Sequence, residues 1–175
     1  ALFHMVTVFP LSWVFLFTNE GPARFLVIEA IGAMFGALAI VASGILADRI
    51  GRRRMLAGFA VVIAVFSGFA PQLLDAGLWG ELTYMIVGFM LLGFVFGQSS
   101  GAFAFRFGRV YRYTASAITS DFAWLFGAGF APLVALGLSS QFGIASSGAY
   151  LLSGAAVTLV AIYATGLPGP RQQRD

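Results

Sequence analysis

The 175-residue sequence has no cysteine, no lysine and a single histidine. Without cysteine there are no disulfide bonds, no catalytic thiolate and no Cys-ligated metal, and one histidine cannot form a metal site by itself. Charged side chains are also scarce, at 10% of the residues, whereas soluble domains carry about 25%. We therefore expect neither a metal nor a cofactor, and the sequence shows no cluster of bases that an intramembrane enzyme would need.

Hydrophobic residues are what the sequence has in excess, at 59% of the chain, and the mean hydropathy is +0.91. A helix needs about 20 apolar residues to cross the hydrocarbon core of a bilayer. Six segments approach this length, so we predict an all-α membrane protein whose residues 1–167 form a bundle of six transmembrane helices. The expected helices lie at about 1–18, 25–47, 55–74, 82–105, 114–138 and 147–167, and a short polar tail, 168–175, follows.

The net charge of +3 could indicate binding to nucleic acid, but the ten basic residues are all arginines, clustered beside the apolar segments. Nine of them lie in the connections at 48–54 and 106–113 or in the tail, and Arg24 lies on the other side. Because an excess of arginine marks cytoplasmic loops, these connections and the C-terminus are expected in the cytoplasm. We expect a multi-pass protein of the plasma or inner membrane, with the lipid bilayer and not nucleic acid as its partner.

The stretch from Gly44 to Arg54 is a dense cationic turn between two apolar segments. Burying its charges in hydrocarbon would cost about 2.5–3.5 kcal/mol each, so the turn belongs at the membrane surface. It resembles the loop between the second and third helices of each half of the major facilitator superfamily, which carries the pattern G-x-x-x-D-[RK]-x-G-[RK]-[RK]. The matching residues are Gly44, Asp48, Arg49, Gly51, Arg52 and Arg53. An ordinary positively charged hairpin is the alternative interpretation.

This resemblance carries several expectations. Gly44 should let the helix end approach a neighbour closely, and Gly51 should permit a tight reversal. The family implies that Asp48 and the loop arginines form a conformational gate, and that the chain is the C-terminal half of a twelve-helix fold with substrate bound between its two halves. Because the sequence opens inside an apolar segment with Ala1 and not methionine, we expect a missing N-terminal six-helix half as its partner.

The fifth apolar segment contains a carboxylate. Asp121 follows Arg112 by nine residues, which is about 13 Å along a helix and near the middle of the membrane. A charge at that depth is costly, so a functional role is expected, with a structural carboxylate as the alternative. Trp124 and Thr114 share its helix face.

We assign proton coupling or substrate contact to Asp121, with Glu29 as second choice. Trp124 could close over a substrate or stack on a cationic group. Thr114 and Gln98 are the remaining polar candidates for the binding region.

The fifth segment also resembles its counterpart in the metabolite:proton symporters, whose eleventh helix opens with an R-Y-[TS]-G-like turn and continues to G-G-x-x-P-L. The residues that match are Arg112-Tyr113-Thr114-Ala115 and Gly127-Ala128-Gly129-Phe130-Ala131-Pro132-Leu133, although Ala115 replaces the glycine and Asp121 stands where the family often has an amide or neutral residue. The resemblance implies a secondary active transporter that couples protons to the symport of a small carboxylate or zwitterionic metabolite by alternating access. A drug or sugar transporter of the same superfamily and a six-helix channel subunit are the alternatives. Substrate identity, symport against antiport, and oligomeric state are left open.

Smaller features complete the expectations. Phe9-Pro10 should kink the first segment, and His4, near the cytoplasmic end of that segment, is either a proton relay or a histidine satisfied by water. Glycines four residues apart, at Gly32 and Gly36 and again from Gly93, predict close helix packing. Four aromatic residues are expected as interfacial anchors: Trp79 and Tyr84 outside, Tyr111 and Tyr113 inside.

Overall fold

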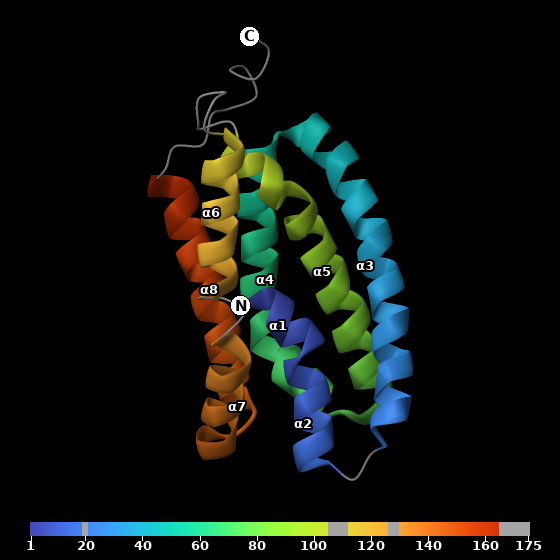
Figure 1. Ribbon diagram of the computed structural model, residues 1–175. Coiled ribbons are helices and arrows are strands. Elements are labelled where there is room, and N and C mark those ends of the chain that lie inside the picture. Colours follow the sequence, from blue (N-terminus) through green and yellow to red (C-terminus); the bar gives the residue numbers. More distant parts are fainter. Residues whose placement is uncertain (19–20, 105–111, 126–129, 165–175) are drawn as a thin grey trace.

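The computed structural model describes residues 1–18, 21–104, 112–125 and 130–164, and over these ranges all regular secondary structure is helical (Figure 1). The prediction of an all-α protein is therefore confirmed. The helices are α1 (Leu2–Thr7), α2 (Phe9–Phe17), α3 (Pro22–Ile50), α4 (Arg52–Leu74), α5 (Gly77–Ala104), α6 (Arg112–Trp124), α7 (Ala131–Phe142) and α8 (Ala145–Ala164).

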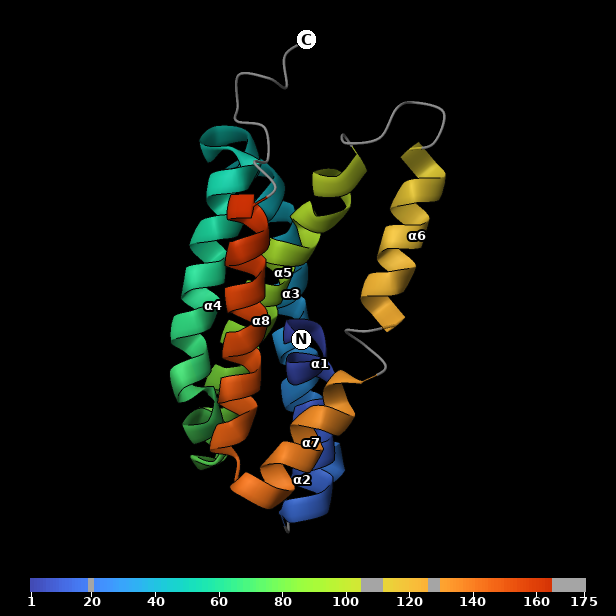
Figure 2. The same cartoon turned by 90° about the vertical axis from the view of Figure 1, so that its left-hand side faces the viewer.

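Four of these helices, α3, α4, α5 and α8, are long and apolar enough to cross a membrane, and α7 is apolar but shorter. The two views show α3, α4, α5 and α8 running side by side (Figures 1 and 2). The α3–α4 turn and the last turn of α8 lie at one end of the bundle, and the α4–α5 and α7–α8 turns lie at the other. We call the first the arginine-rich end, because it holds Arg49, Arg52, Arg53 and Arg54, and the second the opposite end.

A single residue, Gly51, separates α3 from α4 at the arginine-rich end. Its φ is +87°, a region that residues with a Cβ rarely adopt. The Gly51 N–H donates to the Ala47 carbonyl at 2.9 Å, and the Met55 N–H donates to the Gly51 carbonyl at 3.1 Å. The tight reversal expected of Gly51 is therefore what the structure contains.

The first apolar segment is broken into α1 and α2 at Val8, and Pro10 lies in the first turn of α2. The break falls beside the expected kink, because proline has no N–H to continue the ladder of α1. The two helices together are far shorter than α3, so α1 begins about halfway along the bundle (Figure 1). The expectation that His4 lies near the cytoplasmic, arginine-rich end is therefore wrong.

The helices α3 and α5 pack closely because small residues on each face the other. A Cβ added to Gly36 would stand 3.1 Å from the carbonyl oxygen of Phe89, and one added to Gly93 would stand 2.8 Å from the Cβ of Ala39. Neither position has room for a larger side chain without movement of the facing helix. The glycine spacing that predicted packing in both segments is confirmed.

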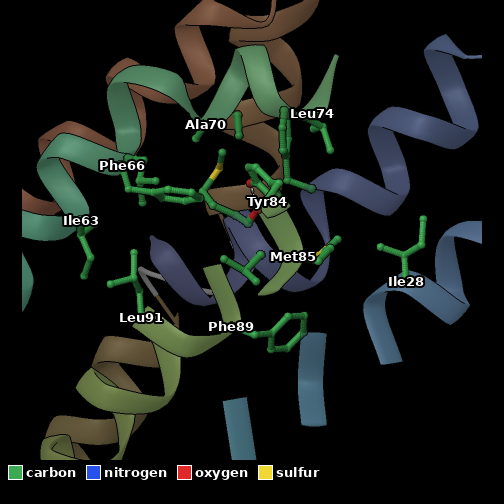
Figure 3. Close-up of a cluster of buried hydrophobic side chains, with 14 of the residues drawn as sticks. Ile28, Ile63, Phe66, Ala70, Leu74, Tyr84, Met85, Phe89 and Leu91 are labelled. Atoms are coloured by element: carbon green, nitrogen blue, oxygen red, sulfur yellow. Dashed lines mark hydrogen bonds between the residues drawn. The ribbon is translucent and has the colours of Figure 1, made fainter. Parts of the chain in front are cut away.

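The hydrophobic core lies where α5 meets α1 and α4 (Figure 3). Tyr84 sits at its centre and is only 2% exposed, and its hydroxyl donates to the Met5 carbonyl. The interfacial role expected for Tyr84 is therefore wrong, because a buried tyrosine whose O–H has an acceptor is a core residue. Trp79, by contrast, is 79% exposed, as an interfacial anchor requires.

Where we predicted one span over 114–138, the structure describes two helices, α6 and α7. Residues 126–129 lie outside the described ranges, and so do the expected glycines Gly127 and Gly129. The helix α6 stands at the edge of the bundle (Figure 2), and its side chains are mostly exposed. No described helix covers this edge, which is where the candidate residues of the fifth segment lie.

Candidate functional site

The residues of the expected conformational gate motif lie on and beside the α3–α4 turn. Asp48 and Arg49 are exposed on the last turn of α3, and Arg52 and Arg53 are partly buried on the first turn of α4. A Cβ added to Gly44 would meet nothing within 4 Å. The close approach expected at Gly44 is therefore not made within the described residues, because this side of α3 faces away from α5.

The arginine-rich end also contains a chain of hydrogen bonds that links three helices. Arg52 Nε on α4 donates to Gln98 Oε1 on α5 at 2.9 Å, and Gln98 Nε2 donates to Ser43 Oγ on α3 at 3.1 Å. The Ser43 hydroxyl in turn donates to the Ile40 carbonyl at 2.6 Å. Both Gln98 and Ser43 are buried. Because water does not reach their polar atoms, these hydrogen bonds are what satisfies them.

This network connects Gln98 to Arg52 of the expected gate motif. We predicted Gln98 as a polar residue of the binding region, but its amide is occupied on both sides by Arg52 and Ser43. The sequence held one signal of the contact: Gly97, directly before Gln98, faces Ser43 across the α3–α5 interface. The partnership with Arg52 lies 46 residues away and carries no local pattern.

The remaining candidates of the fifth segment lie together on α6. Thr114 and Asp121 are exposed, and Trp124, the last residue of α6, is 44% exposed. Because residues 3 or 7 positions apart share a helix face, Asp121 lies one turn from Trp124 and two turns from Thr114. The structure thus keeps these three residues on one accessible stripe.

Trp124 belongs to a cluster of aromatic rings that the sequence reasoning missed. Its indole stands edge-on to the Phe3 ring at 5.0 Å and to the His4 ring at 6.1 Å, measured between centroids. The Phe3 and His4 rings are 4.9 Å apart, and Phe96 of α5 lies 6.5 Å from Phe3. The cluster therefore joins α1, α5 and α6, which are far apart in the sequence.

Glu29, the second choice for proton coupling, is partly buried on α3, nearer the opposite end. An unpredicted carboxylate lies at that end: Glu81 on α5 is 4% exposed, and its Oε2 accepts from Arg24 Nη2 of α3 at 3.4 Å. Arg24 is the lone arginine outside the nine that cluster elsewhere in the sequence. The pair ties the first turns of α3 and α5.

Comparison with known proteins gives sequence relatives but no structural one. No family model and no solved structure matches the chain. The inner membrane metabolite transport protein YhjE of Escherichia coli (strain K12) is 32% identical over 133 residues, which are 75% of this chain and 30% of that protein. Two Haemophilus influenzae proteins that are named as metabolite transport proteins are 32% identical over 143 residues and 30% identical over 136 residues.

The matches to the Haemophilus proteins cover 81% and 77% of this chain, but 32% and 31% of those proteins. The chain therefore spans about a third of the length of the curated relatives that it matches.

Proposed function

This chain belongs to the family of metabolite transport proteins that its relatives represent, and from that premise we propose that it is one six-helix half of a twelve-helix secondary transporter. The proposed fold is of the major facilitator type, with the arginine-rich end and the C-terminus in the cytoplasm. The arginines at one end and the break of the first segment into two helices support this arrangement. The rest of the protein would supply the other half.

The observation that carries the proposal is the position of Asp121. Its side chain is exposed on α6, about 13 Å along the helix from Arg112. A carboxylate that faced hydrocarbon at that depth would be costly. We infer that this face of α6 lines a water-filled path at the junction of the two halves, as transported substrates and protons require.

In the proposed cycle, Asp121 couples protons to the movement of the halves. Its charged form tolerates only a hydrated, open cavity, whereas its neutral form permits closure, so protonation would shift the conformational equilibrium. Trp124, one turn along the same face, would close over the substrate, and Thr114 would line the path. Glu29 on α3 is the second candidate for the proton. The proposed substrate is a small carboxylate or zwitterionic metabolite.

The gate motif fits this cycle as a contact between the two halves. Asp48 and Arg49 are exposed at the arginine-rich end, and Gly44 presents open surface beside them. A carboxylate that becomes partly buried beside the N-terminus of another helix contributes up to about 2 kcal/mol, enough to shift a two-state equilibrium about thirtyfold. We propose that a helix of the other half docks here in one end state.

The test is Asp121→Asn in the full-length transporter, reconstituted in vesicles. If Asp121 carries the proton, gradient-driven accumulation of substrate is lost, while exchange of substrate across the membrane continues. Loss of binding and exchange together would instead make Asp121 a substrate ligand. The measurement is uptake of labelled substrate with and without an imposed proton gradient.

The matched control is Asp75→Asn, which makes the same change on an exposed carboxylate in the α4–α5 turn. Asp75→Asn is expected to keep both accumulation and exchange. Normal accumulation with an unchanged pH profile in Asp121→Asn would contradict both roles proposed for Asp121.

A further inference from the structure

The feature that the proposed function leaves unused is His4 on α1. Both of its ring nitrogens are buried, and neither has a hydrogen-bond partner among the described residues. A buried donor or acceptor without a partner costs about 1–3 kcal/mol, and native structures seldom leave such groups unexplained. The sequence offered two explanations, a proton relay or a histidine satisfied by water. The residues around His4 in the structure indicate which kind of group its nitrogens can bind.

Those surroundings are aromatic. The His4 ring stands edge-on to Phe3 and to Trp124, with centroids 4.9 and 6.1 Å away. The Phe3 ring carries no hydrogen-bonding group, and the indole of Trp124, which has one N–H donor, makes no hydrogen bond to His4. The neighbouring rings therefore pack against the imidazole of His4, but its two nitrogens form no hydrogen bond with them.

The location also matters. The helix α1 begins about halfway along the bundle (Figure 1), and Trp124 ends α6, one turn beyond Asp121. Trp124 is 44% exposed, so one side of the cluster is accessible at the edge that no described helix covers. His4 is thereby placed beside the same stripe of α6 that the proposed function uses.

We propose that His4 contacts the substrate: its imidazole hydrogen-bonds a carboxylate of the transported metabolite, and the Phe3 and Trp124 rings form the wall against which the substrate's apolar part lies. This inference rests on the proposed function, since it concerns the same path. A carboxylate is the chemistry that fits, because its oxygens accept from an imidazole N–H and such charge-assisted bonds are strong. The rings exclude water around the bond and so strengthen it.

The first test uses the absence of cysteine from this chain, with any cysteines of the other half replaced. In the full-length transporter, His4→Cys is treated with a small, water-soluble methanethiosulfonate reagent, and the rate of modification is measured. Rates are compared with and without succinate, lactate and proline as carboxylate probes, at equal ionic strength. The matched control is Met5→Cys, the next residue on α1, which is 2% exposed.

The expected result is that His4→Cys reacts, that Met5→Cys does not, and that a transported probe slows the reaction of His4→Cys at least severalfold. No reaction at His4→Cys, or equal rates with and without a transported carboxylate, overturns the inference. If the unmodified protein transports none of the probes or any other small carboxylate, the proposed function fails as well. These two failures are therefore distinguishable.

The second test separates substrate contact from a proton relay. We expect His4→Ala to raise the KM for a transported carboxylate about tenfold or more, with kcat changed much less. His4→Gln, which keeps an N–H donor, should recover most of the affinity. A relay would instead lose accumulation in both variants while the KM for exchange stayed unchanged, and that outcome would overturn substrate contact. The cysteine test remains decisive if His4→Ala does not reach the membrane.

Discussion

Individual glycines determine how closely the long helices approach. At the α3–α5 interface, Gly93 lies against the backbone of Gly36 and the side chain of Ala39. On α4, Gly68 is exposed, and a Cβ there would meet nothing within 4 Å. The same residue type therefore has opposite roles at the two sites, and only the packing distinguishes them.

Gly93→Ala is expected to destabilise the protein, because the added methyl group overlaps a backbone carbonyl and Ala39, and a packed interface resists such insertions by about 1–3 kcal/mol. The matched change Gly68→Ala should be neutral or slightly stabilising, since alanine favours a helix over glycine by roughly 0.5–1 kcal/mol. The free energy of unfolding of both variants can be measured by SDS titration of the detergent-purified, full-length protein. Equal stability of the two variants would contradict the close α3–α5 contact.

At this scale, the sequence predicts residues well where chemistry allows one environment and poorly where it allows two. Gly51 was predicted correctly. The chain reverses direction between α3 and α4 at this single residue, and such a turn requires the positive φ that glycine adopts readily. Tyr84 was predicted at the interface, yet its ring fills the core, since tyrosine suits either place once its O–H finds an acceptor. His4 was placed at the wrong depth because we took residues 1–18 to span the whole membrane, whereas α1 and α2 together are far shorter than α3.

Among the helices, the hydrogen bonds of Gln98 tie the first turn of α4 to α5 and α3. Arg52, Gln98 and Ser43 each come from a different helix. The gate motif on the α3–α4 turn is therefore fixed to the bundle through α5 as well as through its own glycine. Movement of the motif between two transporter states would have to carry this network or break it.

Gln98→Leu removes the acceptor of Arg52 Nε and the donor to Ser43 within a buried site, so we expect a loss of about 1–3 kcal/mol in stability. Gln98→Glu keeps an acceptor for Arg52 and adds charge assistance, so it should lose much less. Gln72→Leu is the matched control, since Gln72 is an exposed amide on α4. The same SDS titration measures all three.

Similar losses in Gln98→Leu and Gln72→Leu would show that the network contributes nothing to stability.

The network itself could not be read from the sequence, because the interacting side chains are 46 and 55 residues apart. At the level of helices, the sequence does predict which helix faces carry small residues at regular spacing, and where a proline interrupts a helix. Pro10 indicated the division between α1 and α2, and Pro132 lies in the first turn of α7 in the same way.

For the molecule as a whole, a metabolite transport family was predicted from the resemblance of the fifth segment, between Arg112 and Leu133, and the relatives bear out that family. The all-helical class followed from apolar length alone. The candidate site was only partly predictable: the α6 stripe could be seen from helical periodicity, but its contact with α1 depends on how segments more than 100 residues apart pack.

The orientation of the molecule is the last prediction. Ala76 is exposed in the α4–α5 turn and Arg54 is exposed beside the α3–α4 turn, at opposite ends of the bundle. Because arginine-rich loops stay on the cytoplasmic side, Ala76→Cys should react with a membrane-impermeant thiol reagent in intact cells, and Arg54→Cys should react only after the cells are opened. The chain has no cysteine of its own, so with the other half also free of cysteine each signal reports one position. Labelling of Arg54→Cys in intact cells, with Ala76→Cys protected, would place the gate motif outside the cell and contradict the proposed orientation.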